Sequence, residues 1–129
     1  TGADSKELNP ATDDPVIYLM TEWFNDQTGQ VERRDAASDK GATMRLGAYP
    51  CRLMSGSLAQ RAYQQENISE RHRHRYEFNN RYRQYLEDAG MKVAGTSIDG
   101  RLVEMIEIPS HPWFVCCQFH PEEQGRTLR

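Results

Sequence analysis

The chain has 129 residues, which fits one small domain, and its net charge of −3 carries no overall signature of nucleic-acid binding. The apolar share of 37% becomes about 39% when tyrosine is left out and glycine counted, below the ~45–50% of ordinary soluble domains. Three cysteines without paired spacing exclude a disulfide framework, and no apolar run reaches the ~18 residues of a membrane span. These features favour a piece of a soluble domain in a reducing cytoplasm.

The N-terminal third is predicted to consist of polar loops around one buried strand. Residues 1–14 are polar and are interpreted as a surface loop. Residues 16–20 form a continuous apolar run, which is typical of a buried strand. Residues 23–39 are polar around the turn pair Thr28-Gly29, and this pattern predicts a hairpin loop or a lid.

Extended segments and one short helix are predicted next along the chain. Apolar and polar residues alternate over 42–54, which indicates one or two strands. Residues 55–63 begin with serine and continue with helix-forming residues, so they predict a short helix. Residues 68–78 are interpreted as extended.

A second helix is expected over 81–89. Asn79 or Asn80 would be its N-cap, and Gly90 would follow its last turn, where glycine tolerates the left-handed conformation. Three side chains recur at helical spacing and are expected to face the core: Tyr82, Tyr85 and Leu86.

The remaining segments are expected to be strands. Residues 91–97 and 102–108 flank Asp99-Gly100, which is a strong signal for a tight turn between antiparallel strands. Residues 113–119 are apolar enough to form a final strand.

A histidine and a carboxylate follow this final strand. His120 and Glu122 stand at i and i+2, a spacing that places two side chains on the same side of extended backbone. Catalytic groups collect at the carboxyl ends of strands in open α/β sheets. Glu122 is therefore expected to orient the ring of His120 and favour its charged form, as the base of a nucleophile requires. The alternative is a turn histidine that bonds a carboxylate for stability alone.

A metal site is a further interpretation of the same motif. His-x-Glu also opens the zinc deaminase signature, but the Pro-Cys-x-x-Cys that completes this signature does not follow. The two remaining donors are too few for a closed zinc site. We therefore predict no metal site.

Arginine and histidine alternate over Arg71–Arg75. In extended backbone this period places the three arginines on one face and His72 and His74 on the other. Neighbouring guanidiniums attract carboxylate or phosphate, so one interpretation is an anion site. The other is a solvated strand neutralised by acids such as Glu70 and Glu77. Both stay open for the arginines, whereas the two histidines are expected to be structural.

Several segments together resemble the C-terminal glutaminase domain of CTP synthase: Pro109–Glu122 (PSHPWFVCCQFHPE), Glu70–Asn80 (ERHRHRYEFNN), Gly41–Gly47 (GATMRLG) and Thr21–Trp23 (TEW). The likeness is collinear from about residue 1 to 122. The Arg-His alternation and His-Pro-Trp-Phe are more specific to this family than His-Pro-Glu, which many triad-type class I glutamine amidotransferases share. The resemblance implies an α/β fold, namely part of an open mixed, mainly parallel sheet with flanking helices. Residues 1–129 would be the C-terminal portion of the domain, without its N-terminal half.

The resemblance also implies roles for four residues. His120 and Glu122 would be the catalytic base and its orienting acid. Glu7, within Ala3–Leu8, and Arg75 match positions at which the family holds glutamine. Free glutamine carries an α-ammonium and an α-carboxylate, so one acid and one arginine form a complementary clamp.

A parent enzyme with defined substrates and partners follows from the same resemblance. It would make CTP from UTP, ATP and glutamine, using a cysteine thioester to release ammonia for a synthase domain of the same protein. ATP and magnesium would act in that synthase domain, with GTP as an effector. The parent is expected to be a cytoplasmic homotetramer. No cofactor, membrane or nucleic acid is expected for the present chain.

The family's nucleophile lies in a Gly-x-Cys-x-Gly elbow, and this motif does not occur in the sequence. Cys117 would face away from His120, Cys116 would lie roughly 13 Å from it along a strand, and Cys51 has no neighbouring base. All three cysteines are expected to be buried small apolar residues in strands. The chain is therefore expected to be an inactive fragment of low stability, with residues 123–129 departing from the family pattern.

Two other classes of function stay open. The chain would be a binding or regulatory module if it is a catalytically degenerate amidotransferase-like domain. Nucleic-acid binding through Arg71–Arg75 is the second alternative, and the acidic balance of the chain argues against it.

Overall fold

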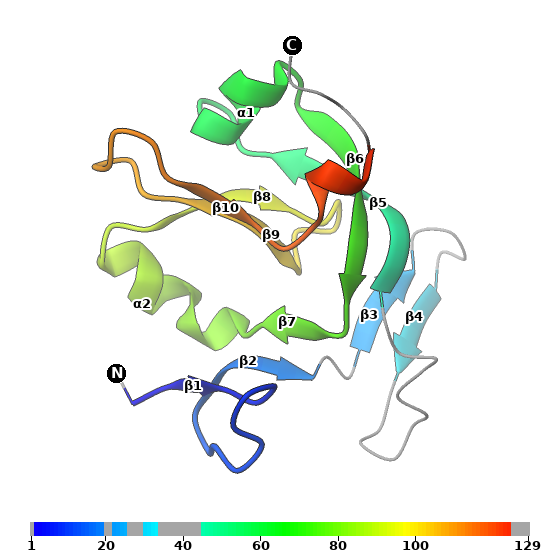
Figure 1. Ribbon diagram of the computed structural model, residues 1–129, viewed down its shortest axis with the longest axis vertical. Helices are drawn as coiled ribbons and strands as arrows, with labels where there is room; N and C mark the ends of the chain where they lie inside the picture. The colour runs from blue at the N-terminus through cyan, green and yellow to red at the C-terminus, as the bar shows by residue number, and fades with distance from the viewer. Residues whose placement is uncertain (1, 20–21, 26–29, 34–44, 125–129) are drawn as a thin grey trace. The chain divides into compact units, whose positions relative to one another are not determined.

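The computed structural model describes residues 2–19, 22–25, 30–33 and 45–124 (Figure 1). These residues belong to two compact units. One unit is formed by Thr1–Arg45 with His74–Asn79, and the other by Leu46–Arg73 with Asn80–Arg129.

The first unit contains a sheet of three short strands in the order β1-β2-β7: β1 (Asp4–Ser5), β2 (Pro15–Leu19) and β7 (Tyr76–Phe78). β1 and β2 are parallel, and β2 and β7 are antiparallel. The apolar run predicted to be a strand is confirmed as β2. The polar segment before it is not entirely loop, because it contributes β1.

A separate hairpin pairs β3 (Glu22–Asn25) with β4 (Gln30–Arg33) in antiparallel register. Of the two interpretations of residues 23–39, a hairpin loop or a lid, the paired strands favour the hairpin; its turn pair Thr28-Gly29 and residues 34–39 lie outside the described residues.

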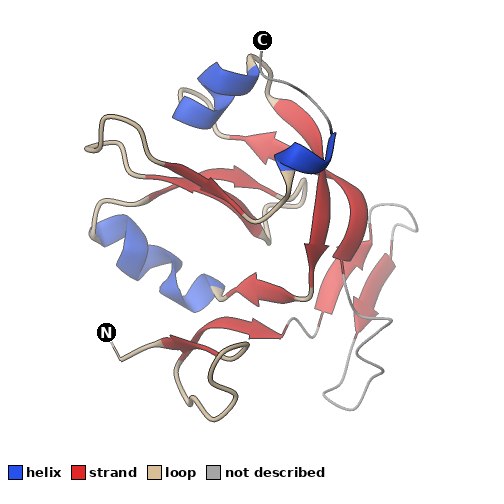
Figure 2. Ribbon diagram, viewed as in Figure 1, coloured by secondary structure: helices blue, strands red, loops and turns tan. Residues whose placement is uncertain are grey.

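The second unit contains a five-stranded sheet in the order β10-β9-β8-β5-β6 (Figure 1). Its strands are β5 (Arg45–Leu53), β6 (Asn67–His74), β8 (Lys92–Thr96), β9 (Val103–Glu107) and β10 (Val115–Cys117). Short helical segments accompany the strands in the described residues of this unit (Figure 2): α1 (Leu58–Tyr63), η1 (Asn80–Tyr82), α2 (Arg83–Asp88) and η2 (Pro121–Gln124). None of the helices in the described ranges is long and apolar enough to cross a membrane.

The expectation of a mainly parallel sheet is not confirmed. β8 is antiparallel to both β5 and β9, and β9 is antiparallel to β10. The turn at Asp99-Gly100 explains part of this arrangement, because a tight turn can join only antiparallel strands, whereas parallel strands need a crossover of a dozen or more residues. Gly100 has a positive φ of 74°, as such a turn favours.

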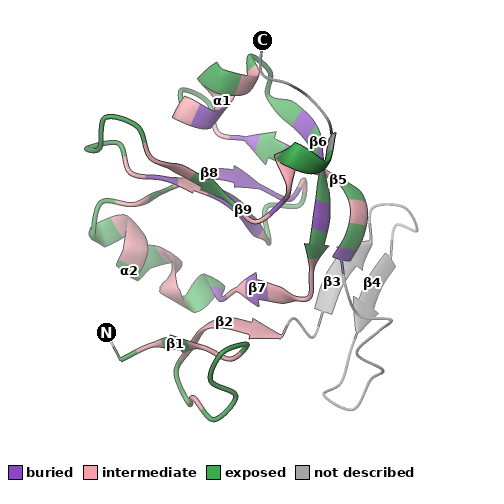
Figure 3. Ribbon diagram, in the orientation of Figure 1, coloured by how far each residue is buried: buried purple, intermediate pink, exposed green. Residues whose placement is uncertain are grey.

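Seven buried residues form the core of the second unit: Cys51, Leu53, Ala59, Ile68, Ala94, Met105 and Phe119. Figure 3 shows buried positions on β5, β6, β8 and β9. The helix predicted over 55–63 is confirmed as α1, which begins after the N-cap Ser57; the hydroxyl of Ser57 accepts a hydrogen bond from the Gln60 N–H at 3.0 Å. Core contacts therefore join α1 to the sheet.

The second helix differs from its prediction in its start and in its buried face. Neither asparagine caps it: the side-chain amide of Asn79 donates to Pro15 O, and that of Asn80 donates to Arg101 O. Tyr85 is 66% exposed, so it does not face the core. Gly90 follows the helix with φ of 96°, as expected.

The last strand is shorter than predicted and lies at an edge of the sheet. Because β10 pairs only with β9 among the described strands, Cys116 and Cys117 are exposed, and the expectation that they are buried is wrong. Cys51, in β5, is completely buried, which confirms the expectation for that residue.

Candidate active site

His120 and Glu122 are brought into direct contact. Nδ1 of His120 lies 2.8 Å from Oε1 of Glu122, and both side chains are exposed to solvent. The contact follows from a turn rather than from strand spacing, because β10 ends at Cys117 and η2 begins at Pro121. The N–H of Glu123 donates to the carbonyl of His120 at 3.1 Å, which closes this tight turn.

The hydrogen bond from His120 is the largest of the effects that lower the pKa of Glu122. A hydrogen bond from the backbone of Glu122 itself and the charge of the imidazolium act in the same direction. Glu122 is thus an acceptor for Nδ1–H at neutral pH. With the proton held on Nδ1, the other ring nitrogen is available to take up a proton, as in a histidine base oriented by an acid.

The backbone that leads into this pair is held by two strands. The N–H of His120 donates to the carbonyl of Arg71 in β6 at 2.9 Å, and the N–H of Gln118 donates to the carbonyl of Glu104 in β9 at 3.0 Å. The guanidinium of Arg71 also lies 3.5 Å from Glu123. The turn that carries the pair is therefore fixed to the sheet of the second unit.

Cys117, near this turn in the sequence, is a poor nucleophile. Although Cys117 as a whole residue is exposed, its sulfur is partly buried, and this desolvation is the main cause that raises the pKa of Cys117 to about 11; the negative charges around it add to the effect. The thiol donates to the carbonyl of Phe119, with the two heavy atoms 3.4 Å apart. At neutral pH Cys117 is a protonated thiol, whereas catalysis requires a thiolate.

The arginine-histidine segment is extended as predicted and forms most of β6. Glu70 and His72 are buried, whereas Arg71 and Arg73 are exposed, so the assignment of the two faces is confirmed for these residues. Arg75 does not continue the row, because it lies in the bend between β6 and β7.

The acids expected to neutralise the arginines have other partners. Glu70 is buried and accepts a hydrogen bond from the hydroxyl of Tyr63 at 3.1 Å. Glu77 is buried and lies 3.1 Å from Arg45. Arg71 pairs instead with Glu123, an acid that follows the predicted catalytic pair in sequence.

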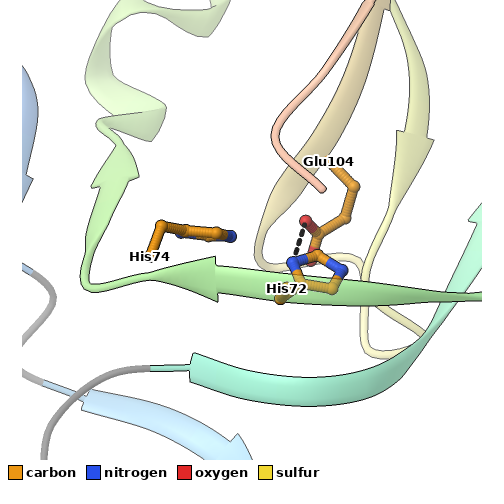
Figure 4. Close-up of side chains that lie close together, drawn as sticks. All are labelled: His72, His74 and Glu104. Carbon is orange, nitrogen blue, oxygen red and sulfur yellow. Dashed lines mark ion pairs between the residues drawn. The ribbon is translucent and has the colours of Figure 1, made fainter. Parts of the chain in front are cut away.

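Sequence reasoning did not single out Glu104, a buried residue of β9. Figure 4 shows its carboxylate directed at the ring of His72, and Oε2 lies 3.6 Å from Nδ1. A carboxylate inside the apolar run 102–106 was the signal that could have found it, because acids are rarely buried without a partner. His74, the other histidine of β6, lies 3.4 Å from Glu77 within the first unit.

Glu7 and Arg75 both belong to the first unit. Glu7 is exposed in the turn that follows β1, and its N–H donates to the hydroxyl of Ser5 at 3.3 Å. Arg75 is half-buried. Within the described part of the chain, no hydrogen bond or ion pair joins these two side chains to each other.

Comparisons with known proteins agree with the sequence resemblance. The chain is 59% identical over 120 residues to the CTP synthase of Oleidesulfovibrio alaskensis, covering 93% of this chain and 22% of that protein. It is 56% identical over 127 residues to the CTP synthase of Lawsonia intracellularis, and this match covers 98% of this chain and 23% of that protein. The chain thus spans less than a quarter of the length of these relatives.

A solved structure shares the fold. The glutaminase domain of Trypanosoma brucei CTPS with bound acivicin superposes with a TM-score of 0.73 and 29% sequence identity, covering 94% of this chain and 43% of the other. The model of the family "Glutamine amidotransferase class-I" matches residues 19–129, which is most of the chain. This protein belongs to the class-I glutamine amidotransferase family.

Proposed function

We propose that the chain is the C-terminal portion of the glutaminase domain of a CTP synthase. The full-length CTP synthase that would contain it is called the parent enzyme below. This enzyme hydrolyses glutamine and passes ammonia to a synthase domain, which forms CTP from UTP and ATP. The contact between His120 and Glu122 is the main support for the proposal, because it provides an oriented base in a chain that shares more than half of its aligned residues with CTP synthases.

His120 acts as the base and acid of glutamine hydrolysis. It takes the proton of the cysteine thiol that another segment of the parent enzyme supplies, and the thiolate attacks the side-chain amide of glutamine. The imidazolium then protonates the leaving ammonia, and the neutral ring activates the water that hydrolyses the thioester. Glu122 keeps the proton of the resting ring on Nδ1 and stabilises the imidazolium.

Glu7 and Arg75 hold the substrate through its charges. The carboxylate of Glu7 complements the α-ammonium of glutamine, and the guanidinium of Arg75 complements its α-carboxylate. ATP and magnesium act in the synthase domain, GTP is an effector, and the parent enzyme is a cytoplasmic homotetramer. No metal takes part in glutamine hydrolysis.

The chain by itself has no glutaminase activity. Its sequence contains no Gly-x-Cys-x-Gly motif, and the raised pKa of Cys117 keeps that thiol protonated. A glutamine-mimicking electrophile should therefore label none of the three cysteines selectively. Selective labelling of any of them would contradict this part of the proposal.

A chimaera tests the function directly. Residues 1–129 replace the matching segment of the O. alaskensis CTP synthase, and CTP formation is measured with glutamine and with ammonium as nitrogen donors. We expect activity with both donors, and we expect His120→Ala to remove only the activity with glutamine. A folded chimaera that uses ammonium but not glutamine, even without the substitution, would favour a catalytically degenerate binding module.

A further inference from the structure

The segment Gln118–His120 is fixed by more than the backbone hydrogen bonds already described. The side-chain amide of Gln118 donates to the carbonyl of Val103 in β9. The side chain of Phe119 points into the core and is only 3% exposed. The residue directly before His120 is therefore an anchor, and its contacts decide where the imidazole of His120 lies.

The ring of Phe119 packs edge-on against the ring of His72. Their centroids lie 5.6 Å apart, with 61° between the ring planes. The ring of Tyr49 contacts His72 in a similar edge-on geometry at 5.5 Å. His72 is thus enclosed by aromatic rings, and only 1% of the residue is exposed.

His72 is held in turn by Glu104. Their side chains are completely buried, and Nδ1 of His72 lies 3.6 Å from Oε2 of Glu104 (Figure 4). His72 belongs to β6 and Glu104 to β9, which are separated by β8 and β5 in the strand order. The carbonyl of Glu104 accepts from Gln118, and the carbonyl next to His72, that of Arg71, accepts from His120. The buried pair therefore links the two strands that hold the segment.

We propose that His72, paired with Glu104, is a positioning residue for glutamine hydrolysis. It holds Phe119 in place and thereby sets the position of His120 relative to the thiol and the amide that exchange protons with it. His72 itself touches neither substrate nor nucleophile. This role rests on the proposed function, because it requires His120 to be the base.

A positioning role and an ordinary core role predict different kinetics. Misplacing a catalytic group by about 1 Å lowers the rate about 100-fold without removing substrate contacts. A loss of core packing instead unfolds part of the glutaminase domains, so it lowers the fraction of active sites that a glutamine-mimicking electrophile labels at completion. The kcat per labelled site therefore separates the two roles.

The test is His72→Gln in the parent enzyme, with kcat and KM for glutamine measured alongside ammonia-dependent CTP formation. We expect kcat with glutamine to fall about 10- to 100-fold, with KM and the ammonia-dependent rate changed by less than about threefold. In an enzyme that already carries Glu122→Gln, the same substitution should lower kcat by a much smaller factor, because both act through His120. A fall in kcat that is matched by an equal fall in the labelled fraction of active sites, or full additivity with Glu122→Gln, would overturn the proposal.

Two further variants complete the test. His111→Gln is the matched control, because His111 also packs edge-on against a phenylalanine, Phe114, at 5.9 Å but is exposed; it should leave both activities unchanged. Phe119→Leu removes the ring contact while leaving His72 and Glu104 in place, and it should reproduce the selective loss of kcat.

The outcomes separate the positioning role from the proposed function. If His120→Ala lowers only the glutamine-dependent activity but neither His72→Gln nor Phe119→Leu does so, the positioning role fails while the proposed function stands. If His120→Ala lowers the ammonia-dependent activity as well, the proposed function itself fails.

Discussion

The imidazole of His120 and the carboxylate of Glu122 are 2.8 Å apart within a turn that the backbone of β6 and β9 holds in place. Their contact is exposed, so it is open to a reacting group brought by another segment. The hydrogen bond from the Glu123 N–H to the His120 carbonyl closes this turn. The acid can therefore orient the ring before any substrate arrives.

The titration of Glu122 reports this contact. The hydrogen bond from His120 lowers the pKa of Glu122 below its ordinary value of 4.5. The bond is therefore fully present at pH values above 4.5 and is lost as the pH falls through the lowered pKa. His120→Ala should return the pKa of Glu122 toward 4.5. Carbon-13 NMR of labelled glutamate carboxyls measures it, and an unchanged midpoint in the variant would show that His120 does not cause the shift.

Cys117 should react slowly with alkylating reagents. Its pKa of about 11 leaves very little thiolate at pH 7.5, so we expect iodoacetamide to modify Cys117 at least about 10-fold more slowly than a free thiol of ordinary pKa. The rate should keep rising with pH up to about 11. Mass spectrometry of timed digests measures the modification, and a rate that levels off below pH 9 would contradict the raised pKa.

Gly95→Ala should destabilise the second unit through overpacking. A Cβ at Gly95 would lie 3.0 Å from Sγ of Cys51 and 3.2 Å from side-chain carbons of Leu53 and Met105. The expected loss in the free energy of unfolding is about 1–3 kcal/mol. Gly2→Ala is the control, because a Cβ there meets nothing within 4 Å. Thermal unfolding of the two variants should differ clearly, and equal melting temperatures would contradict the tight packing at Gly95.

The buried ion pair of the first unit should contribute far more to the free energy of unfolding than an exposed pair of similar geometry. The side chains of Arg45 and Glu77 are only 4% and 2% exposed, so Glu77→Gln removes a buried charge that the Arg45 guanidinium contacts and should cost about 3–5 kcal/mol. Arg83 and Glu87 lie 3.2 Å apart but are partly exposed, and Glu87→Gln should cost at most about 1 kcal/mol. Denaturant unfolding compares the two, and similar losses would show that burial does not strengthen the Arg45 pair.

Local patterns in the sequence predicted much of the second unit. The serine before α1, the Asp99-Gly100 turn and Gly90 were recognisable because each depends on a few neighbouring residues. The alternation of β6 predicted its two faces, because side chains of a strand point to opposite sides. The contact of His120 with Glu122 was also predicted, although from strand spacing rather than from the turn that forms it.

Features that depend on distant segments were not accessible from the sequence in the same way. Tyr85 has the helical spacing of a core residue, but among the described strands none covers it enough to bury it. Cys116 and Cys117 lie in an apolar stretch, but their exposure follows from the place of β10 at the sheet edge. Glu104 is paired with His72 across two intervening strands, and no spacing along the chain encodes such a partner.

The acid–base role of His120 and Glu122 is tested most simply by Glu122→Gln in the parent enzyme, assayed with glutamine and with ammonium. The amide keeps the shape of the side chain but removes the charge that orients and stabilises the imidazolium. We expect CTP formation from glutamine to fall about 100- to 10,000-fold, while formation from ammonium stays within about twofold of the unsubstituted enzyme. A parallel loss with both nitrogen donors, or full retention with glutamine, would contradict the assignment of His120 and Glu122 as the acid–base pair.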